Sequence, residues 1–265
     1  MVNNEHLLKK KLLVKNFFYN IAGNIAPILL AIIFIPLIIK NIDLDRYGLL
    51  TLIWMIIGYF GLFDMGLGRV LTQQISELIG KNQESKILTV IWTTLTILFF
   101  FGLMISIILF FFSNYLTNII LNIPKDLIIE TNHCVIILCV LFPISLISSA
   151  LTGILISFQR FDLVNLITVP LSFYNYIATF IAIIFTKNLT YIVLILAIGR
   201  IIHISLLSIF CSNTIPRFFN RINFKKELVL PLIKFGGWIT ISNLLSPIIT
   251  SLDRFFISSY TTVNN

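Results

Sequence analysis

The stretch Phe63-Asp64-Met65-Gly66-Leu67-Gly68-Arg69-Val70 places a carboxylate and two glycines directly after a long apolar run. That run, from Gly48 to Phe63, has 16 residues, so as a helix it measures roughly 24 Å, less than the ~30 Å hydrocarbon layer of a bilayer. A helix that crosses the membrane here must therefore include Asp64 and the glycines after it. Because a carboxylate in contact with lipid costs several kcal/mol, we expect Asp64 to face an interior built by several packed helices.

The composition of the whole chain also indicates a membrane protein. Of its 265 residues, 58% are hydrophobic and only 11% are charged, against about 25% charged in average soluble domains. The apolar residues come in long blocks separated by short polar breaks, which is typical of a protein with several membrane spans. No small-residue cleavage pattern follows the first block, so no cleavable signal peptide is expected.

The apolar blocks predict about seven transmembrane helices, since lipid cannot satisfy exposed backbone groups and a helix satisfies its own. The fold class is therefore all-α, a polytopic membrane helix bundle. The second span is expected to continue as a polar helix through Glu77, and a basic amphipathic stretch, Phe224–Lys234, precedes the seventh span. The predicted spans are about Phe17–Ile39, Tyr47–Leu71, Ile87–Phe112, Thr131–Phe158, Leu163–Phe185, Leu189–Cys211 and Phe235–Tyr260.

The distribution of positive charge predicts the orientation of these spans. The formal charge is +8, and the basic residues cluster in loops, so membrane topology explains them better than nucleic-acid binding. With a cytoplasmic N-terminus, most of the 19 basic residues fall on the cytoplasmic side of the membrane. The opposite side receives Lys40, Arg46, Lys125 and Lys187. This positive-inside bias predicts a multi-pass protein whose N-terminus is cytoplasmic.

Several spans carry polar residues at steps of three and four, which places each set on one helix face. For the serine face of the fourth span, we interpret the pattern as helix–helix contact, because small and polar residues dominate such contacts in membranes. The stripes of the first, fifth and seventh spans are rich in amides, and there a water-filled cavity and helix contact are both open. The amides that mark these stripes are Asn24, Asn175 and Asn243.

Charged residues within the spans are functional candidates by default, because lipid disfavours them. Arg200 lies near the middle of the sixth span, with His203 one turn further on, and Asp253 and Arg254 lie late in the seventh. The structural alternative is an ion pair of Arg200 with Asp64 or Asp253. His203 and His133 are candidates for proton relay, although a single membrane histidine is commonly just hydrogen-bonded.

The sequence contains no nucleotide-binding glycine loop, no metal-ligand cluster and no nucleophile with an acid–base pair. Cys134, Cys139 and Cys211 lie in apolar blocks without CxxC spacing and are expected to serve packing. We therefore predict no catalytic residue, no metal and no cofactor.

A series of short motifs runs along nearly the whole chain. In order, they are Asn20 with Asn24 and Pro36, Asp45-Arg46-Tyr47-Gly48, Phe63-Asp64-Met65-Gly66-Leu67, Ile75-Ser76-Glu77-Leu78, Lys234-Phe235-Gly236, Ser246-Pro247 and Asp253-Arg254-Phe255. In their order and spacing they resemble the bacterial polysaccharide biosynthesis proteins, which are oligosaccharide-repeat-unit flippases such as the O-antigen flippases. Those proteins belong to the multidrug/oligosaccharidyl-lipid/polysaccharide exporter superfamily.

The resemblance implies a flippase that moves undecaprenyl-pyrophosphate-linked oligosaccharides across the bacterial cytoplasmic (inner) membrane by alternating access, and not an enzyme. It implies a basic central cavity, for which Arg200 and Arg254 are the available cations, with Asn24, Asn175 and Asn243 beside them. Asp64, Asp253 and His203 are the candidates for ion coupling. The implied partners are the lipid-linked oligosaccharide, membrane lipid and other polysaccharide assembly proteins, without nucleic acid.

Family members have two helical bundles, and the resemblance predicts one complete bundle here and the first helix of a second. The expected division is a basic N-terminus at 1–16, a six-helix bundle at 17–211, a basic linker at 212–234 and the start of the second bundle at 235–265. The alternative functions are an ion-coupled multidrug exporter of the same superfamily and a membrane polysaccharide polymerase or acyltransferase.

Overall fold

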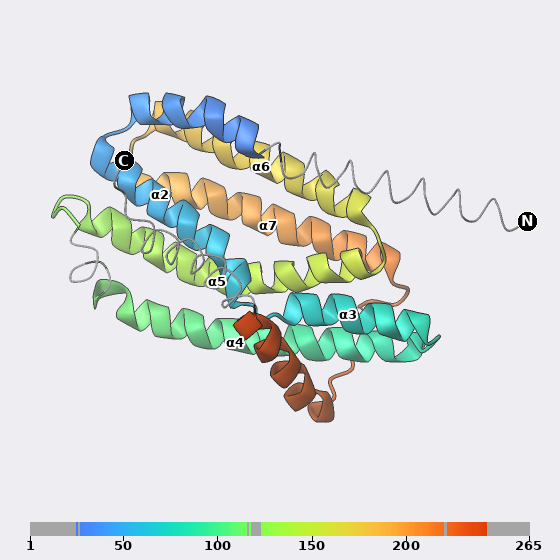
Figure 1. Cartoon of the computed structure of the whole chain (residues 1–265). Coiled ribbons are helices and arrows are strands. Elements are labelled where there is room, and N and C mark those ends of the chain that lie inside the picture. The colour runs from blue at the N-terminus through green and yellow to red at the C-terminus, as the bar shows by residue number, and fades with distance from the viewer. Residues whose placement is uncertain (1–24, 26, 116, 118–122, 220–221, 243–265) are drawn as a thin grey trace, which may run out of the picture.

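The computed structural model describes residues 25, 27–115, 117, 123–219 and 222–242, and among these residues it contains helices and turns but no strand. A helix at Pro27–Asn41 comes first, and a helix of residues 226–242 comes last. Between them Figure 1 shows a row of helices of similar direction. These are α2 (Leu44–Tyr59), α3 (Leu67–Gly80), α4 (Ile87–Tyr115), α5 (Ile128–Ser157), α6 (Phe161–Phe185) and α7 (Leu189–Thr214), with short 3-10 helices η1 (Phe60–Phe63) and η2 (Glu84–Lys86).

Four helices in the described part of the chain are long and apolar enough to cross a membrane. They confirm the predicted third to sixth spans, whose ends they match to within one helical turn. Of the predicted first span, the described part from Pro27 onward is helical. The spans are Glu84–Tyr115, Ile128–Ser157, Phe161–Phe185 and Leu189–Thr214. The chain is therefore an all-α, multi-pass membrane bundle, as expected.

Helix α5 forms the centre of the bundle, because α3, α4 and α7 all pack against it. Helices α3 and α5 approach so closely that a Cβ on Gly153 would lie within 3.0 Å of the Gly68 carbonyl oxygen. The Thr72 hydroxyl of α3 donates to the Gly153 carbonyl at 3.0 Å across this contact. Large side chains such as Phe111 and Phe185 are 76% and 84% exposed on the outside, the surface that lipid would cover.

The predicted second span is not one continuous helix, and this part of the prediction is wrong. Helix α2 ends at Tyr59, η1 follows, and α3 begins only at Leu67. Between them Met65 and Gly66 have positive φ angles of 53° and 65°, a left-handed conformation that is cheap for glycine and costly inside any α-helix. The span is therefore broken in its middle.

Asp64 stabilises this break by satisfying the backbone groups that α3 leaves unpaired at its start. Its carboxylate accepts hydrogen bonds from the Gly66 amide at 2.8 Å and from the Gly68 amide at 3.2 Å. The Ser149 hydroxyl of α5 donates to the same carboxylate at 2.6 Å. Asp64 is only 7% exposed, so the carboxylate faces the protein interior, as the sequence predicts.

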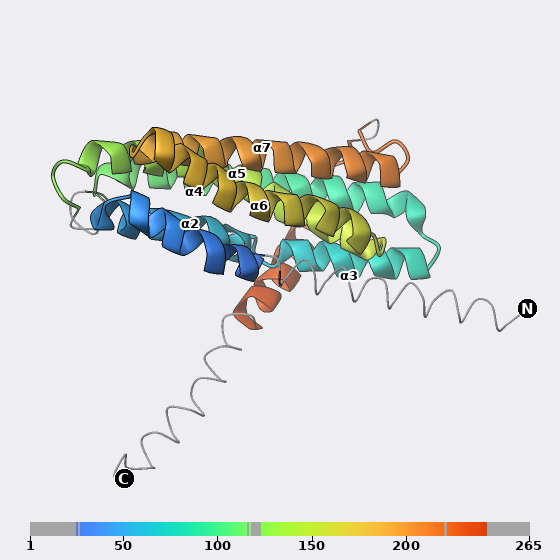
Figure 2. The ribbon, with the colours of Figure 1, turned by 90° about the horizontal axis from the view of Figure 1, so that it is seen from above.

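The helix of residues 226–242 packs onto the break. In Figures 1 and 2 this orange-red helix stands at a steep angle to the long helices, near the junction of α2 and α3. A Cβ on Gly236 would lie within 3.0 Å of the Met65 carbonyl oxygen, so the two backbones are in direct contact. The predicted amphipathic stretch and the start of the predicted seventh span thus form one helix without a boundary between them.

Two adjacent glycines of this helix allow a matched test of the contact. We expect Gly236→Ala to destabilise the protein by about 1–3 kcal/mol, because the new methyl group meets the Met65 carbonyl. Gly237→Ala is the control, since its Cβ would meet no described atom within 4 Å, and alanine favours a helix. Thermal unfolding of the purified protein in detergent measures both, and equal changes would contradict the contact.

Candidate functional site

A cavity of about 220 Å³ lies within the bundle, between the helix Pro27–Asn41, α2, α6 and α7. Arg200 lies roughly 16 Å along α7 from its first residue, and the whole helix measures roughly 39 Å, so the cavity is near mid-membrane depth. The cavity is lined by Pro27, Trp54, Ile57, Gly58, Ser172, Asn175, Tyr176, Leu196 and Arg200.

The helical repeat brings these side chains to one place. The lining residues of α6, namely Ser172, Asn175 and Tyr176, follow steps of three and one, and Leu196 and Arg200 of α7 are four residues apart. The polar stripe predicted for the fifth span thus reaches the cavity in part. Of the polar residues of this helix, Ser172 and Asn165 both donate to backbone carbonyls one turn earlier, Ser172 to Thr168 and Asn165 to Phe161, each at 2.9 Å.

Arg200 is the cation of this cavity. Its guanidinium makes no hydrogen bond or ion pair with another residue in the described part of the chain. The ion pair with Asp64 that the sequence left open is not formed, because Asp64 is bonded to Gly66, Gly68 and Ser149. A guanidinium carries five donors and no acceptor, so its ligand must present acceptor oxygens, and an anionic ligand binds most strongly.

Two aromatic residues of the cavity were not predicted as site residues. Trp54 of α2 and Tyr176 of α6 lie edge to face, with ring centroids 5.6 Å apart. The available signal was depth: tryptophan and tyrosine in membrane helices favour the interfaces, and Trp54 lies well inside the second span. An aromatic residue with a polar atom at that depth needs a partner within the bundle.

Asp64 does not line the cavity, and its carboxylate caps α3 instead. We expect Asp64→Ala to lower stability by about 3 kcal/mol or more, because two buried amides and the Ser149 hydroxyl lose their acceptor. Asp64→Asn keeps one side-chain oxygen for the Gly66 amide and should cost less than half as much. Thermal unfolding of both variants checks the order, and equal losses would argue against the capping role.

His203 borders a second cavity of about 280 Å³ between α6 and α7, which is lined mainly by apolar side chains. Its Nδ1 atom is buried and has no hydrogen-bond partner among the described residues. His203 does not line the first cavity, although it lies one helical turn from Arg200 on α7 and within reach of its charge. His133 of α5 is exposed.

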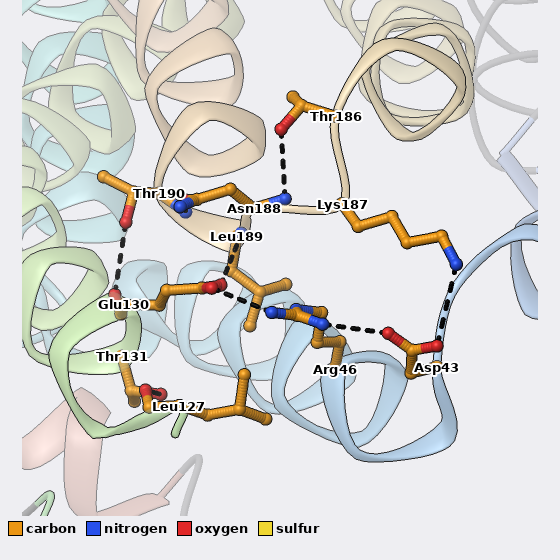
Figure 3. A network of polar contacts seen from close by, with 10 residues as sticks. All are labelled: Asp43, Arg46, Leu127, Glu130, Thr131, Thr186, Lys187, Asn188, Leu189 and Thr190. Atoms are coloured by element: carbon orange, nitrogen blue, oxygen red, sulfur yellow. Dashed lines mark hydrogen bonds and ion pairs between the residues drawn. The ribbon is translucent and has the colours of Figure 1, made fainter. Parts of the chain in front are cut away.

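A polar network ties together one end of the bundle, and Figure 3 shows it at close range. Arg46 donates to Asp43 and to Glu130, each at 2.9 Å. The second Glu130 oxygen accepts the Leu189 amide at 3.1 Å, and the Lys187 ammonium lies 3.7 Å from Asp43. The start of α2, the first turn of α5 and the connection from α6 to α7 are thus held to one another.

The charges of this network explain one pKa shift. The hydrogen bond from Arg46, with the charge of Lys187, lowers the pKa of the Asp43 carboxyl below its usual value. Because the pKa of Asp43 is lowered in the folded state, its interaction with Arg46 stabilises the fold at pH values above the ordinary carboxyl pKa. This stabilisation is lost as the pH falls through the lowered value.

Removing Glu130 should weaken the network more than removing Asp43. The Glu130 side chain is 16% exposed and joins three elements, whereas Asp43 is 54% exposed. We expect Glu130→Ala to lower stability by about 1–3 kcal/mol, because the half-buried Arg46 and the Leu189 amide both lose an acceptor. Asp43→Ala should leave the thermal midpoint almost unchanged, and a larger fall there than in Glu130→Ala would be the contrary result.

Four of the predicted site residues, Asn24, Asn243, Asp253 and Arg254, lie outside the residues that the structure describes. Within the described ranges, His, Cys, Asp and Glu side chains form no group of three or more that could hold a metal ion. The residues that the structure brings together are therefore Arg200, Asn175 and Ser172 with Trp54 and Tyr176.

Comparison with known proteins gives consistent matches over nearly the whole chain. Residues 13–264 match the family described as polysaccharide biosynthesis protein. The protein named "Putative O-antigen transporter" from Shigella flexneri is 25% identical over 257 residues, which is 93% of this chain and 58% of that protein.

Two solved structures share the fold. A MATE protein in complex with MaD3S aligns with a TM-score of 0.59 at 18% identity, over 92% of this chain and 53% of its own. A MOP superfamily transporter from Pyrococcus furiosus, for which a binding pocket of reverse polarity is described, aligns with a TM-score of 0.57 at 18% identity. This alignment covers 92% of this chain and 52% of the transporter. The chain thus spans about half the length of the relatives that it matches.

Proposed function

Since the chain belongs to the polysaccharide biosynthesis protein family, we propose that its helices form part of a membrane flippase for lipid-linked oligosaccharide repeat units. The observation that carries this proposal is the cavity at mid-membrane depth, where the Arg200 guanidinium has no partner among the described residues. Polar sites near the bilayer midplane, between helices that include broken ones, are the usual substrate sites of transporters.

The proposed substrate is an undecaprenyl-pyrophosphate-linked oligosaccharide of surface polysaccharide, such as O-antigen or capsule. Arginine suits the pyrophosphate because its planar fork forms two parallel, charge-assisted hydrogen bonds with phosphoryl oxygens. Asn175 adds an amide that can both donate to and accept from sugar hydroxyls. The Ser172 hydroxyl donates to the Thr168 carbonyl at 2.9 Å, so its oxygen remains as an acceptor for them. Alternating access would expose this cavity first to one side of the membrane and then to the other.

We further propose that the protein lies in the bacterial inner membrane with the network of Arg46 and Glu130 at the outer surface. The support is the positive-inside rule, since the opposite end carries Lys81, Lys86 and Arg160. Ion coupling is assigned to Asp64, Asp253 and His203, and other polysaccharide assembly proteins are the proposed partners. For Asp64, loss of transport in a stable Asp64→Asn variant would support a role in ion coupling. Retained transport would exclude that role and leave Asp64 only its structural role at the start of α3.

The multidrug exporter is the second candidate, because it shares the fold. An exporter of organic cations needs acidic groups in its cavity, and the described lining contains Arg200 and neither aspartate nor glutamate. The lining therefore favours an anionic substrate. A polymerase or acyltransferase would need an active-site set of ionisable residues, and the described lining has none beyond Arg200 and Tyr176.

Deletion of the gene tests the proposal, with the gene supplied in trans as the control. We expect lipid-linked repeat units of normal composition to accumulate on the inner leaflet, and surface polysaccharide to disappear. Polymer of altered length on the surface would indicate a polymerase instead. Unchanged polysaccharide with a broader sensitivity to cationic drugs would indicate the exporter.

A further inference from the structure

We propose that Trp54 is a specificity-determining residue of the cavity, and that its indole N–H donates to the same phosphoryl group that Arg200 binds. This inference rests on the proposed function and deepens it, because it identifies the second anchor of the substrate's phosphate.

The Trp54 indole is a buried donor that lacks an acceptor. Its Nε1 atom is buried and has no hydrogen-bond partner among the described residues. A buried polar group without a partner is costly, and native structures contain few of them unless a ligand, ion or water completes the pair. Trp54 lines the same cavity as Arg200, so the two residues adjoin one space.

The orientation of the indole is fixed by its neighbour. The Trp54 ring lies edge to face against Tyr176 at 5.6 Å, with an angle of 65° between the ring planes. Such a pair resists rotation of either ring, because rotation would lose the favourable contact of edge with face. The ring contact therefore favours one orientation of the indole before any ligand arrives.

The hydrogen-bonding chemistry of the two groups selects the ligand class. An indole nitrogen only donates, and a guanidinium only donates. A ligand that completes both must present acceptor oxygens, and an anion gains most because both bonds are then charge-assisted or ionic. Phosphoryl oxygens meet this requirement, whereas an ammonium group, which also only donates, would leave both residues without partners.

A contrast within the chain supports a ligand role for Trp54. The Trp92 indole also lies within the bundle, and its Nε1 donates to the Phe218 carbonyl at 2.9 Å, which satisfies it within the protein. Trp238 is 70% exposed, so solvent or the lipid headgroup region is open to it. Of these three tryptophans, Trp54 is the one whose buried donor is left without an acceptor in the described part of the chain.

Binding of farnesyl pyrophosphate to the purified protein in detergent tests the inference, with farnesol as the neutral probe of equal tail. We expect Trp54→Phe, which keeps an aromatic ring and removes the N–H, to weaken farnesyl pyrophosphate binding about tenfold to a hundredfold. Farnesol binding should not change. Trp238→Phe is the matched control and should bind both probes like the unmodified protein.

The variant Trp54→His restores a ring N–H and should retain more affinity for the pyrophosphate than Trp54→Phe. If Trp54→Phe and Trp54→His both lose farnesyl pyrophosphate binding completely, with unchanged thermal stability, the role of the N–H group is overturned. If Arg200→Ala loses binding but Trp54→Phe keeps it, the inference on Trp54 fails and the proposed function stands. If the unmodified protein prefers farnesol, the proposed function itself fails. It also fails if Arg200→Ala binds farnesyl pyrophosphate as well as the unmodified protein does.

Discussion

Replacement of Arg200 by alanine is expected to abolish export of surface polysaccharide in cells that express the variant from its own gene. The arginine contributes the cation of the cavity, and no other lysine or arginine is part of its described lining. Loss of two charge-assisted hydrogen bonds to a phosphate costs about 3–5 kcal/mol, or roughly a factor of 10² to 10⁴ in affinity. Surface polysaccharide, measured by gel electrophoresis or antibody binding, should fall to background.

Two further variants separate charge from geometry. Arg200→Lys keeps a positive charge but replaces the planar fork by a point charge, so part of the export should remain. Arg217→Ala removes an exposed arginine outside the cavity and should export normally. Normal polysaccharide from a correctly inserted Arg200→Ala variant would refute the assigned role.

Replacement of Gly153 by alanine should strongly destabilise the bundle at the contact between α3 and α5. The added Cβ would lie within 3.0 Å of the Gly68 carbonyl and close to the Thr72 hydroxyl, and backbone cannot move aside as a flexible side chain can. Helices α3 and α5 would have to separate at the point where Thr72 bonds the Gly153 carbonyl. The expected loss is about 3 kcal/mol, or a fall of about 6–12 °C in thermal midpoint.

Gly48→Ala provides the control for this prediction. Gly48 also lies within a helix, α2, and a Cβ there would meet no described atom within 4 Å. Alanine is the better helix former, so stability should be equal or slightly higher. A similar fall of the midpoint in both variants would show that the close contact of α3 with α5 is absent in the membrane protein.

The sequence predicted the long spans well, because length and continuous hydrophobicity decide whether a segment crosses a bilayer. Helices α4 to α7 are strongly apolar over their length, and their ends follow the polar breaks. The break after Tyr59 was not predicted, since the apolar run continues through it to Phe63. A hydrogen bond from Ser149, 85 residues away in the chain, contributes to that break, and local sequence carries no sign of such a partner.

The candidate site was predicted in part for the same reason. Arg200 and Asn175 stand out as polar residues in apolar surroundings, and both line the cavity. Tryptophan and tyrosine are common in membrane helices. Whether Trp54 and Tyr176 belong to a site depends on which helices pack against them, and this cannot be read from the local sequence. The network of Arg46 with Glu130 joins residues 84 positions apart, a distance over which the sequence alone gives no pairing.

The broken span also gives the two halves of the predicted second span different neighbours. The start of α3 is held to α5 by the hydrogen bonds of Ser149 with Asp64 and of Thr72 with the Gly153 carbonyl. Helix α2 instead contributes Trp54, Ile57 and Gly58 to the lining of the cavity, and none of the described lining residues comes from α3. Substitutions in α3 should therefore change mainly the stability of the bundle, whereas substitutions in the last turns of α2 should change mainly what the cavity binds.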